Sequence, residues 1–151
     1  MYQAKIDEFF SAFGESGILC LATAADEKVS ARSMSFIICG EKFYFQTDKN
    51  FAKYSQICKN KNVALCVNNI QIEGVCREIG HPFDAENSWF SEKYEQLFKN
   101  SFESYSHLKT EGVFEVSPTK ITVWKYEGSE TFREVFDTAE KSFRKEKYLP
   151  E

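Results

Sequence analysis

This 151-residue chain has few prolines and glycines, no long apolar run and no excess of basic charge, and each of these excludes a class of protein. Its three prolines and seven glycines are too few for a collagen-like or disordered protein. No apolar run reaches the roughly 18 residues of a membrane span, and the N-terminus lacks the basic start and apolar run of a signal peptide. The net charge of -4 lacks the basic excess typical of nucleic-acid binding. The sequence therefore predicts a cytoplasmic protein whose partners include neither a membrane nor a nucleic acid.

The five cysteines follow neither a metal-binding nor a disulfide pattern, because their number is odd and no two have CxxC spacing. Four of them lie in apolar or strand-like runs, where a free thiol packs as a small hydrophobic group. We therefore expect reduced structural thiols and no metal site. Aromatic residues are abundant instead, with fifteen Phe, seven Tyr and two Trp. Because aromatic residues are common at interface cores, this surplus favours a homodimer.

The length suits a single domain over residues 1–151. Apolar spacing predicts helices over residues 2–13 and 50–60, and one or two more between about 84 and 105. The charged tail from Lys141 is expected to be helical or frayed. Expected strands cover residues 18–24, 29–39, 42–46, 63–67, 70–80, 113–116, 121–126 and 131–137. Short turns join most of them, so we predict a mainly β (α+β) fold: an antiparallel barrel of about six or seven strands with flanking helices.

An arginine interrupts the apolar face of one expected strand. Alternation along residues 29–39 places Arg32 in line with Met34 and Phe36, so its guanidinium needs a partner. A phosphate suits it, because the planar guanidinium can make two parallel charge-assisted bonds. The alternative is an arginine at a strand end that reaches solvent or a local carboxylate, and from this feature alone that alternative is favoured.

A lysine near the start of the next helix strengthens the case for a phosphate. Lys53 lies in the first turn, where a cation is misplaced with respect to the helix dipole. The free amides of a helix N-terminus, a lysine and the hydroxyl of Thr47 together form a suitable anion site. A solvated Lys53 beside Asp48 is equally consistent with this feature by itself. With Arg32 nearby, the combination predicts a bound phosphorylated cofactor.

Other polar residues carry weaker signals. Asn68 and Asn69 could contact the edge of a heterocycle, but a hairpin turn is the favoured interpretation. Trp124 lies in an expected strand, where a core or interface role is usual. His81 and His107 are single histidines in polar contexts. The sequence contains no Ser-His-Asp set, HExxH motif, P-loop or GxGxxG motif.

Four motifs occur in a familiar order and spacing. They are Arg-x-Met at residues 32–34, an aromatic strand at 43–47 that ends in threonine, a lysine six residues later at 53, and Pro-x5-Trp at 118–124. Over about residues 16–126 the chain resembles the pyridoxamine 5'-phosphate oxidase-like family of FMN-binding split β-barrels. Within that family it is most similar to small members grouped with nitroimidazole-resistance and general stress proteins.

The resemblance implies FMN bound at a homodimer interface. Arg32 and Lys53 would hold the 5'-phosphate with help from Thr47. The remaining implied contacts to FMN are the backbone groups of Ser33, Met34 and Ser35, the side chains of Gln46 and Asn69, and Trp124 from the partner subunit.

Two departures from the oxidase itself argue against vitamin B6 oxidation. The residues after Trp124 lack the oxidase's arginine-containing segment, and Ala52 replaces a second basic residue, which suggests weaker FMN binding. The leading hypothesis is an FMN-dependent oxidoreductase that acts on a small organic molecule, with nitroaromatic reduction and NAD(P)H as family possibilities. Alternatives are a non-catalytic flavin-binding or redox-buffering protein, a member that binds a deazaflavin or haem, and a structural dimer with a vestigial phosphate site.

Overall fold

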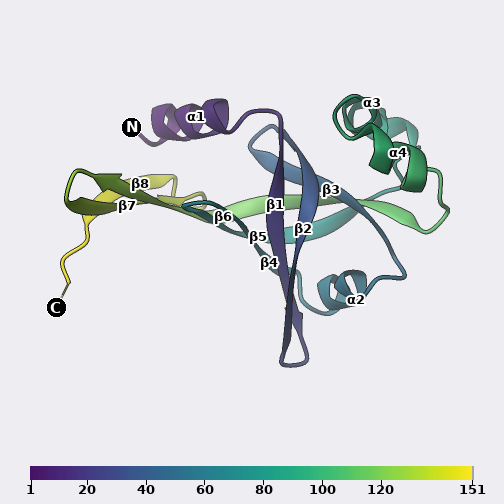
Figure 1. Cartoon of the computed structure of the whole chain (residues 1–151), viewed down its shortest axis with the longest axis horizontal. Coiled ribbons are helices and arrows are strands. Elements are labelled where there is room, and N and C mark those ends of the chain that lie inside the picture. Colours follow the sequence, from purple (N-terminus) through teal and green to yellow (C-terminus); the bar gives the residue numbers. More distant parts are fainter. Residues whose placement is uncertain (151) are drawn as a thin grey trace.

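A computed structural model describes residues 1–150 of the chain (Figure 1). The helices are α1 (Tyr2–Phe13), α2 (Ala52–Lys59), α3 (Ser88–Leu97) and α4 (Lys99–Tyr105), with a short 3-10 turn at Ala85–Asn87. The strands are β1 (Ser16–Ala25), β2 (Lys28–Cys39), β3 (Lys42–Asp48), β4 (Asn62–Val67), β5 (Ile70–Gly80), β6 (Glu111–Glu127), β7 (Glu130–Asp137) and β8 (Ser142–Lys147). Among the described residues, no helix combines the length and apolar character needed to cross a membrane.

The strands form one antiparallel sheet that closes on itself. Their order is β3-β2-β1-β4-β5-β6-β7-β8, and a further pairing of β3 with β6 closes the first six into a barrel. β7 and β8 extend away from the barrel on the side opposite α3 and α4 (Figure 1). The predicted fold class, a mainly β antiparallel split barrel with flanking helices, is confirmed.

Strand β6 is longer than the sequence indicates because it changes partners. Residues 111–116 pair with β3, and residues 120–127 pair with β7. The prediction of two separate strands around Pro118 was therefore wrong. Pro118 lies between the two partner strands and opposite Gly74, beside an irregularity in the β5 ladder, which is a position that tolerates proline. A Cβ atom on Gly74 would lie 2.8 Å from the Ser117 carbonyl oxygen, so only glycine fits there.

The C-terminal tail is also a strand, and the prediction of a helical or frayed tail was wrong. Phe143 of β8 packs against Phe136 of β7 with ring centroids 4.9 Å apart. Arg133 lies opposite Glu146 across the two strands, and their side chains form a 2.8 Å ion pair. Cross-strand pairs of this kind stabilise an antiparallel ladder. The charges that suggested a solvated tail are therefore used in strand pairing.

Two groups of side chains position the helices. Phe36, Phe43 and Phe45 point into the barrel, where α1 packs near Phe43 and α2 near the other end of β3. A second cluster lies on the outer face of β2, β3 and β6, beneath α3. Its buried members are Ile37, Tyr44, Phe90, Tyr94 and Val113. Helices α3 and α4 therefore cover the outside of the barrel wall next to β2 and β3.

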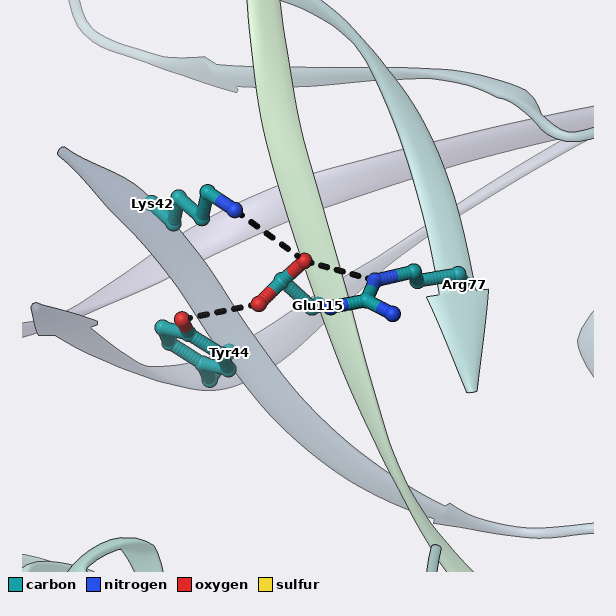
Figure 2. Close-up of polar contacts among 4 residues, drawn as sticks. All are labelled: Lys42, Tyr44, Arg77 and Glu115. Carbon is teal, nitrogen blue, oxygen red and sulfur yellow. Dashed lines mark hydrogen bonds and ion pairs between the residues drawn. The ribbon is translucent and has the colours of Figure 1, made fainter. Parts of the chain in front are cut away.

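A buried carboxylate joins three strands where the barrel closes (Figure 2). Glu115 of β6 accepts a 2.9 Å hydrogen bond from the Tyr44 hydroxyl of β3 and a 2.8 Å bond from Arg77 Nε of β5. The Lys42 ammonium lies 3.4 Å from the same carboxylate. Burial alone raises the pKa of the Glu115 carboxyl, but these bonds and the two cations outweigh it and leave the pKa below its usual value. Every oxygen of this carboxylate has a partner, so its role is structural.

We expect Glu115→Gln to reduce the free energy of unfolding at neutral pH by about 2 kcal/mol, since hydrogen bonds to a charged group are lost. Because the folded-state pKa is lowered, this stability is present above the usual glutamate pKa of about 4.5 and is lost as the pH falls further. Urea unfolding at several pH values measures the difference, which should vanish in acid. The control is Glu127→Gln, an exposed ion-pair member whose loss should change little. Equal stability of Glu115→Gln and the wild type at neutral pH would contradict the assignment.

Candidate functional site

The candidate site lies where β2 and β3 separate. Only Ile37–Cys39 of β2 pair with Lys42–Tyr44 of β3, and beyond these residues the strands diverge. A cavity of about 240 Å³ lies there, bounded by β2, β3, β6 and helices α2, α3 and α4. Its lining residues are Ser33, Met34, Ser35, Gln46, Thr47, Asp48, Phe51, Lys53, Tyr94, Ser101, Tyr105 and Glu111. Six of the nine predicted site residues are thus brought together.

Lys53 enters the cavity from the first turn of α2. The turn before it is held by the Asn50 amide, which donates to the Asp48 carboxylate at 2.9 Å. Burial lowers the pKa of the Lys53 ammonium, and the charge of Arg32 lowers it further. Its nitrogen lies 4.5 Å from the centroid of the Phe51 ring, and no carboxylate of residues 1–150 forms an ion pair with it. The first turn of α2 contains no acidic residue. Lys53 therefore brings a cation without an ion-pair partner among residues 1–150 to a cavity that Asp48 and Glu111 also line.

Arg32 lies beside the cavity instead of lining it. Its Nη1 donates to the Leu21 carbonyl at 3.2 Å and to the Thr23 hydroxyl at 2.9 Å. Thr23 in turn donates to the side-chain carbonyl of Gln56 on α2. The guanidinium of Arg32 thus has hydrogen-bond partners within the chain, as its place on an apolar strand face required. These acceptors are uncharged, so they do not neutralise its positive charge. The charge of Arg32 contributes to the lowered pKa of Lys53, so the two cations are neighbours near the start of α2.

Asn69 and Trp124 lie elsewhere and contact each other. The Asn69 amide donates to the Trp124 carbonyl at 2.5 Å, and the Trp124 amide donates to the Asn69 carbonyl at 3.0 Å. The Trp124 ring lies against the Arg133 guanidinium, 5.7 Å from its centroid. Along β6, Trp124 is separated from Glu111 by roughly 40 Å of extended strand. A single chain therefore does not bring Asn69 or Trp124 to the cavity.

The two histidines lie outside the cavity lining. His81 Nε2 donates to the Leu108 carbonyl at 2.8 Å, and its Nδ1 accepts a 2.9 Å bond from the Phe83 amide. Both ring nitrogens of His81 are thus engaged within the chain, whereas His107 is exposed. Residues 1–150 contain no cluster of three or more side chains that could hold a metal ion.

Comparison with known proteins gives the family. A family model described as pyridoxamine 5'-phosphate oxidase matches residues 3–125. The chain belongs to the pyridoxamine 5'-phosphate oxidase family. No curated protein matches it.

Solved structures share the fold of this pyridoxamine 5'-phosphate oxidase family member at low sequence identity. A pyridoxamine 5'-phosphate oxidase-related, FMN-binding protein from Nostoc punctiforme is 15% identical with a TM-score of 0.61, covering 99% of this chain and 93% of its own. PhzG from Burkholderia lata was solved with tetrahydrophenazine-1-carboxylic acid. It is 15% identical with a TM-score of 0.66, and the match covers 99% of this chain and 89% of PhzG. HutZ, a haem storage protein from Vibrio cholerae, is 13% identical with a TM-score of 0.61, and the match covers 90% of this chain and 94% of HutZ.

Several residues that line the cavity of this family member were not predicted from the sequence. Tyr94, Ser101 and Tyr105 come from α3 and α4, which were predicted as helices without a packing partner. Glu111 is buried, and burial together with the nearby Asp48 raises the pKa of its carboxyl to about 7, although the charge of Lys53 opposes the shift. Nothing local marks Glu111, because it meets Asp48 only through the pairing of β3 with β6.

Proposed function

We propose that this protein binds FMN and uses it to oxidise or reduce a small organic molecule. The observation that carries the proposal is the pair of cations, Arg32 and Lys53, at the start of α2 beside the cavity. Both are partly buried, and burial lowers the pKa of each group. A phosphate group would relieve their mutual repulsion and could accept hydrogen bonds from both. Membership of the pyridoxamine 5'-phosphate oxidase family supports FMN as the phosphorylated ligand.

The other cavity residues fit FMN chemically. The hydroxyl of Thr47 is available next to the proposed phosphate position. Because β2 and β3 separate, the edge of β2 at Ser33–Ser35 offers backbone donors and acceptors to a flat ring. Gln46 of β3 adds a side-chain amide to the cavity lining. When bound, FMN supplies the redox chemistry, and the protein binds, orients and shields it. This division of labour needs no acid or base from the protein for the electron transfer itself.

We further propose that the working form is a homodimer. A cavity of about 240 Å³ is small for a ligand of this size, since typical ligand pockets have about 300–1,000 Å³. A second subunit would add the missing wall. Asn69 and Trp124, which one chain holds far from its own cavity, would then be contributed by the partner.

Two experiments test the function. The first is an absorption spectrum of the purified protein in the near-ultraviolet and visible range, before and after adding FMN and desalting. Twin flavin bands that survive desalting are expected. A Soret band would instead indicate haem. A protein that never retains flavin would refute the proposal. The second experiment screens nitroaromatic compounds and quinones with NADH or NADPH, and flavin retention without turnover would favour a redox-buffering role.

A further inference from the structure

Two buried polar atoms in the cavity wall have no hydrogen-bond partner among residues 1–150. They are Nε2 of Gln46 and Oε2 of Glu111, whose residues are only 5% and 2% exposed. The other amide atom of Gln46, its Oε1, accepts a 3.1 Å bond from the buried Ser106 hydroxyl, so Nε2 is directed away from Ser106. Buried polar atoms without partners are rare because they cost free energy, and both residues line the same cavity. They therefore point to a ligand.

The pairing of β3 with β6 places these two atoms on one surface. Gln46 lies opposite Val113, and Asp48 lies opposite Glu111, so Gln46 and Glu111 are diagonal neighbours on the same face of the ladder. Such neighbours are about 7–8 Å apart at their Cα atoms, within reach of one edge of a planar ring. One of them offers an N–H donor and the other a carboxyl acceptor. Together they are complementary to a group that presents an acceptor beside a donor.

The charges around Glu111 show which end of a ligand belongs there. Asp48 of β3 and Lys53 of α2 influence its ionisation, and Tyr94 of α3 lines the same cavity. A phosphate would be repelled by the two carboxylates and attracted to Lys53 and Arg32. An uncharged N–H donor would instead be stabilised by a carboxylate acceptor. The cavity therefore offers two kinds of contact: cations suited to a phosphate, and the Glu111 carboxyl, which can accept a hydrogen bond from an uncharged donor.

We infer that Gln46 and Glu111 recognise a ring edge on which an N–H lies beside a carbonyl, as in an imide or lactam. The ring N–H donates to the Glu111 carboxylate, and Gln46 Nε2 donates to the ring carbonyl. The inference rests on the proposed FMN site and deepens it, because the pyrimidine part of the flavin ring carries such an edge. Glu111 becomes a specificity-determining residue in this arrangement.

The test compares FMN with its N3-methyl derivative, in which a methyl group replaces the imide hydrogen. Binding is measured by quenching of flavin fluorescence, so no turnover is needed. We expect methylation to weaken binding to the wild-type protein at least about tenfold, because Glu111 is left buried without its donor. In Glu111→Leu the penalty should fall below about threefold. Leucine keeps the bulk of the side chain, so a purely steric penalty would persist in this variant.

Controls separate the outcomes. The control Glu8→Leu makes the same exchange on the exposed face of α1 and should still bind N3-methyl FMN at least about tenfold more weakly than FMN. Gln46→Leu, which removes the other proposed contact, should bind both flavins more weakly than the wild type. Thermal unfolding verifies that each variant is folded. If the wild-type protein binds FMN and N3-methyl FMN equally well, the inference fails while the proposed function stands, and water satisfies the two polar atoms. A penalty of the same size in Glu111→Leu also overturns it. If neither flavin binds, the proposed function fails as well.

Discussion

Replacing Arg32 and Lys53 together by alanine should abolish FMN retention while leaving the barrel folded. Each charge-assisted hydrogen bond to the phosphate is worth about 1.5–3 kcal/mol. Loss of both should weaken FMN binding roughly a hundredfold to ten-thousandfold. Flavin absorbance after desalting gives the qualitative result, and a fluorescence titration gives the dissociation constant. The double variant also loses the bonds from Arg32 to Leu21 and Thr23, so it should unfold at a lower temperature than the wild type but remain folded under the assay conditions.

The single variants refine this prediction. Lys53 lines the cavity, whereas Arg32 also holds the Leu21 carbonyl and Thr23. Arg32→Ala should therefore lower thermal stability as well as affinity, and Lys53→Ala should affect affinity alone. Lys49→Ala is the matched control, because this nearby lysine is already paired with Glu78 at 2.7 Å. Wild-type flavin occupancy in the double variant would remove the proposed phosphate site.

Glu111→Gln should stabilise the protein without FMN by about 3 kcal/mol at a pH above 7. In the folded wild-type protein the pKa of this carboxyl is raised to about 7, mainly by burial, whereas an exposed glutamate ionises near 4.5. Between these two values the unfolded chain releases a proton that the folded chain retains. The free energy of unfolding of the wild type therefore decreases as the pH rises from about 4.5 to about 7, and is then constant. Glutamine has no proton to lose and removes this slope.

Urea unfolding from about pH 5 to about pH 8 measures both curves. The two proteins should have similar stabilities at the acid end and diverge toward neutrality. Glu115→Gln should show the opposite pH dependence. Because the folded-state pKa of Glu115 is lowered, the stability that this carboxylate contributes is lost only in acid. Parallel curves for the wild type and Glu111→Gln would show that Glu111 ionises normally and is not buried as described.

Features that depend on neighbours in the chain could be predicted from the sequence. Apolar periodicity located α1, and alternation along β2 put Phe36 on the apolar face of the strand, which the structure packs inside the barrel. The two-residue turn at Asp26 and Glu27, both with positive φ, also fixes the register that sets Arg32 opposite Leu21. The neutral partners of Arg32 could therefore have been found from the hairpin alone.

Features that depend on distant pairing could not be predicted in this way. The length of β6 follows from its exchange of β3 for β7 near Pro118, which no local pattern encodes. Burial of Glu111 depends on β3 and on the packing of α3 and α4. The motif residues Ser33–Ser35, Thr47 and Lys53 line one cavity. Their contacts to FMN, the homodimer and the reduction of nitroaromatic compounds remain predictions.

The composition of β8 has a consequence for colloidal behaviour. β8 is an outer edge of the sheet, so one side of its backbone is open to pairing with another molecule. Four of its six residues are charged, namely Arg144, Lys145, Glu146 and Lys147. Charged side chains on an edge strand discourage strand-by-strand addition of further copies. The charged segment whose sequence suggested a frayed or helical tail thus hinders growth of the sheet into fibrous aggregates.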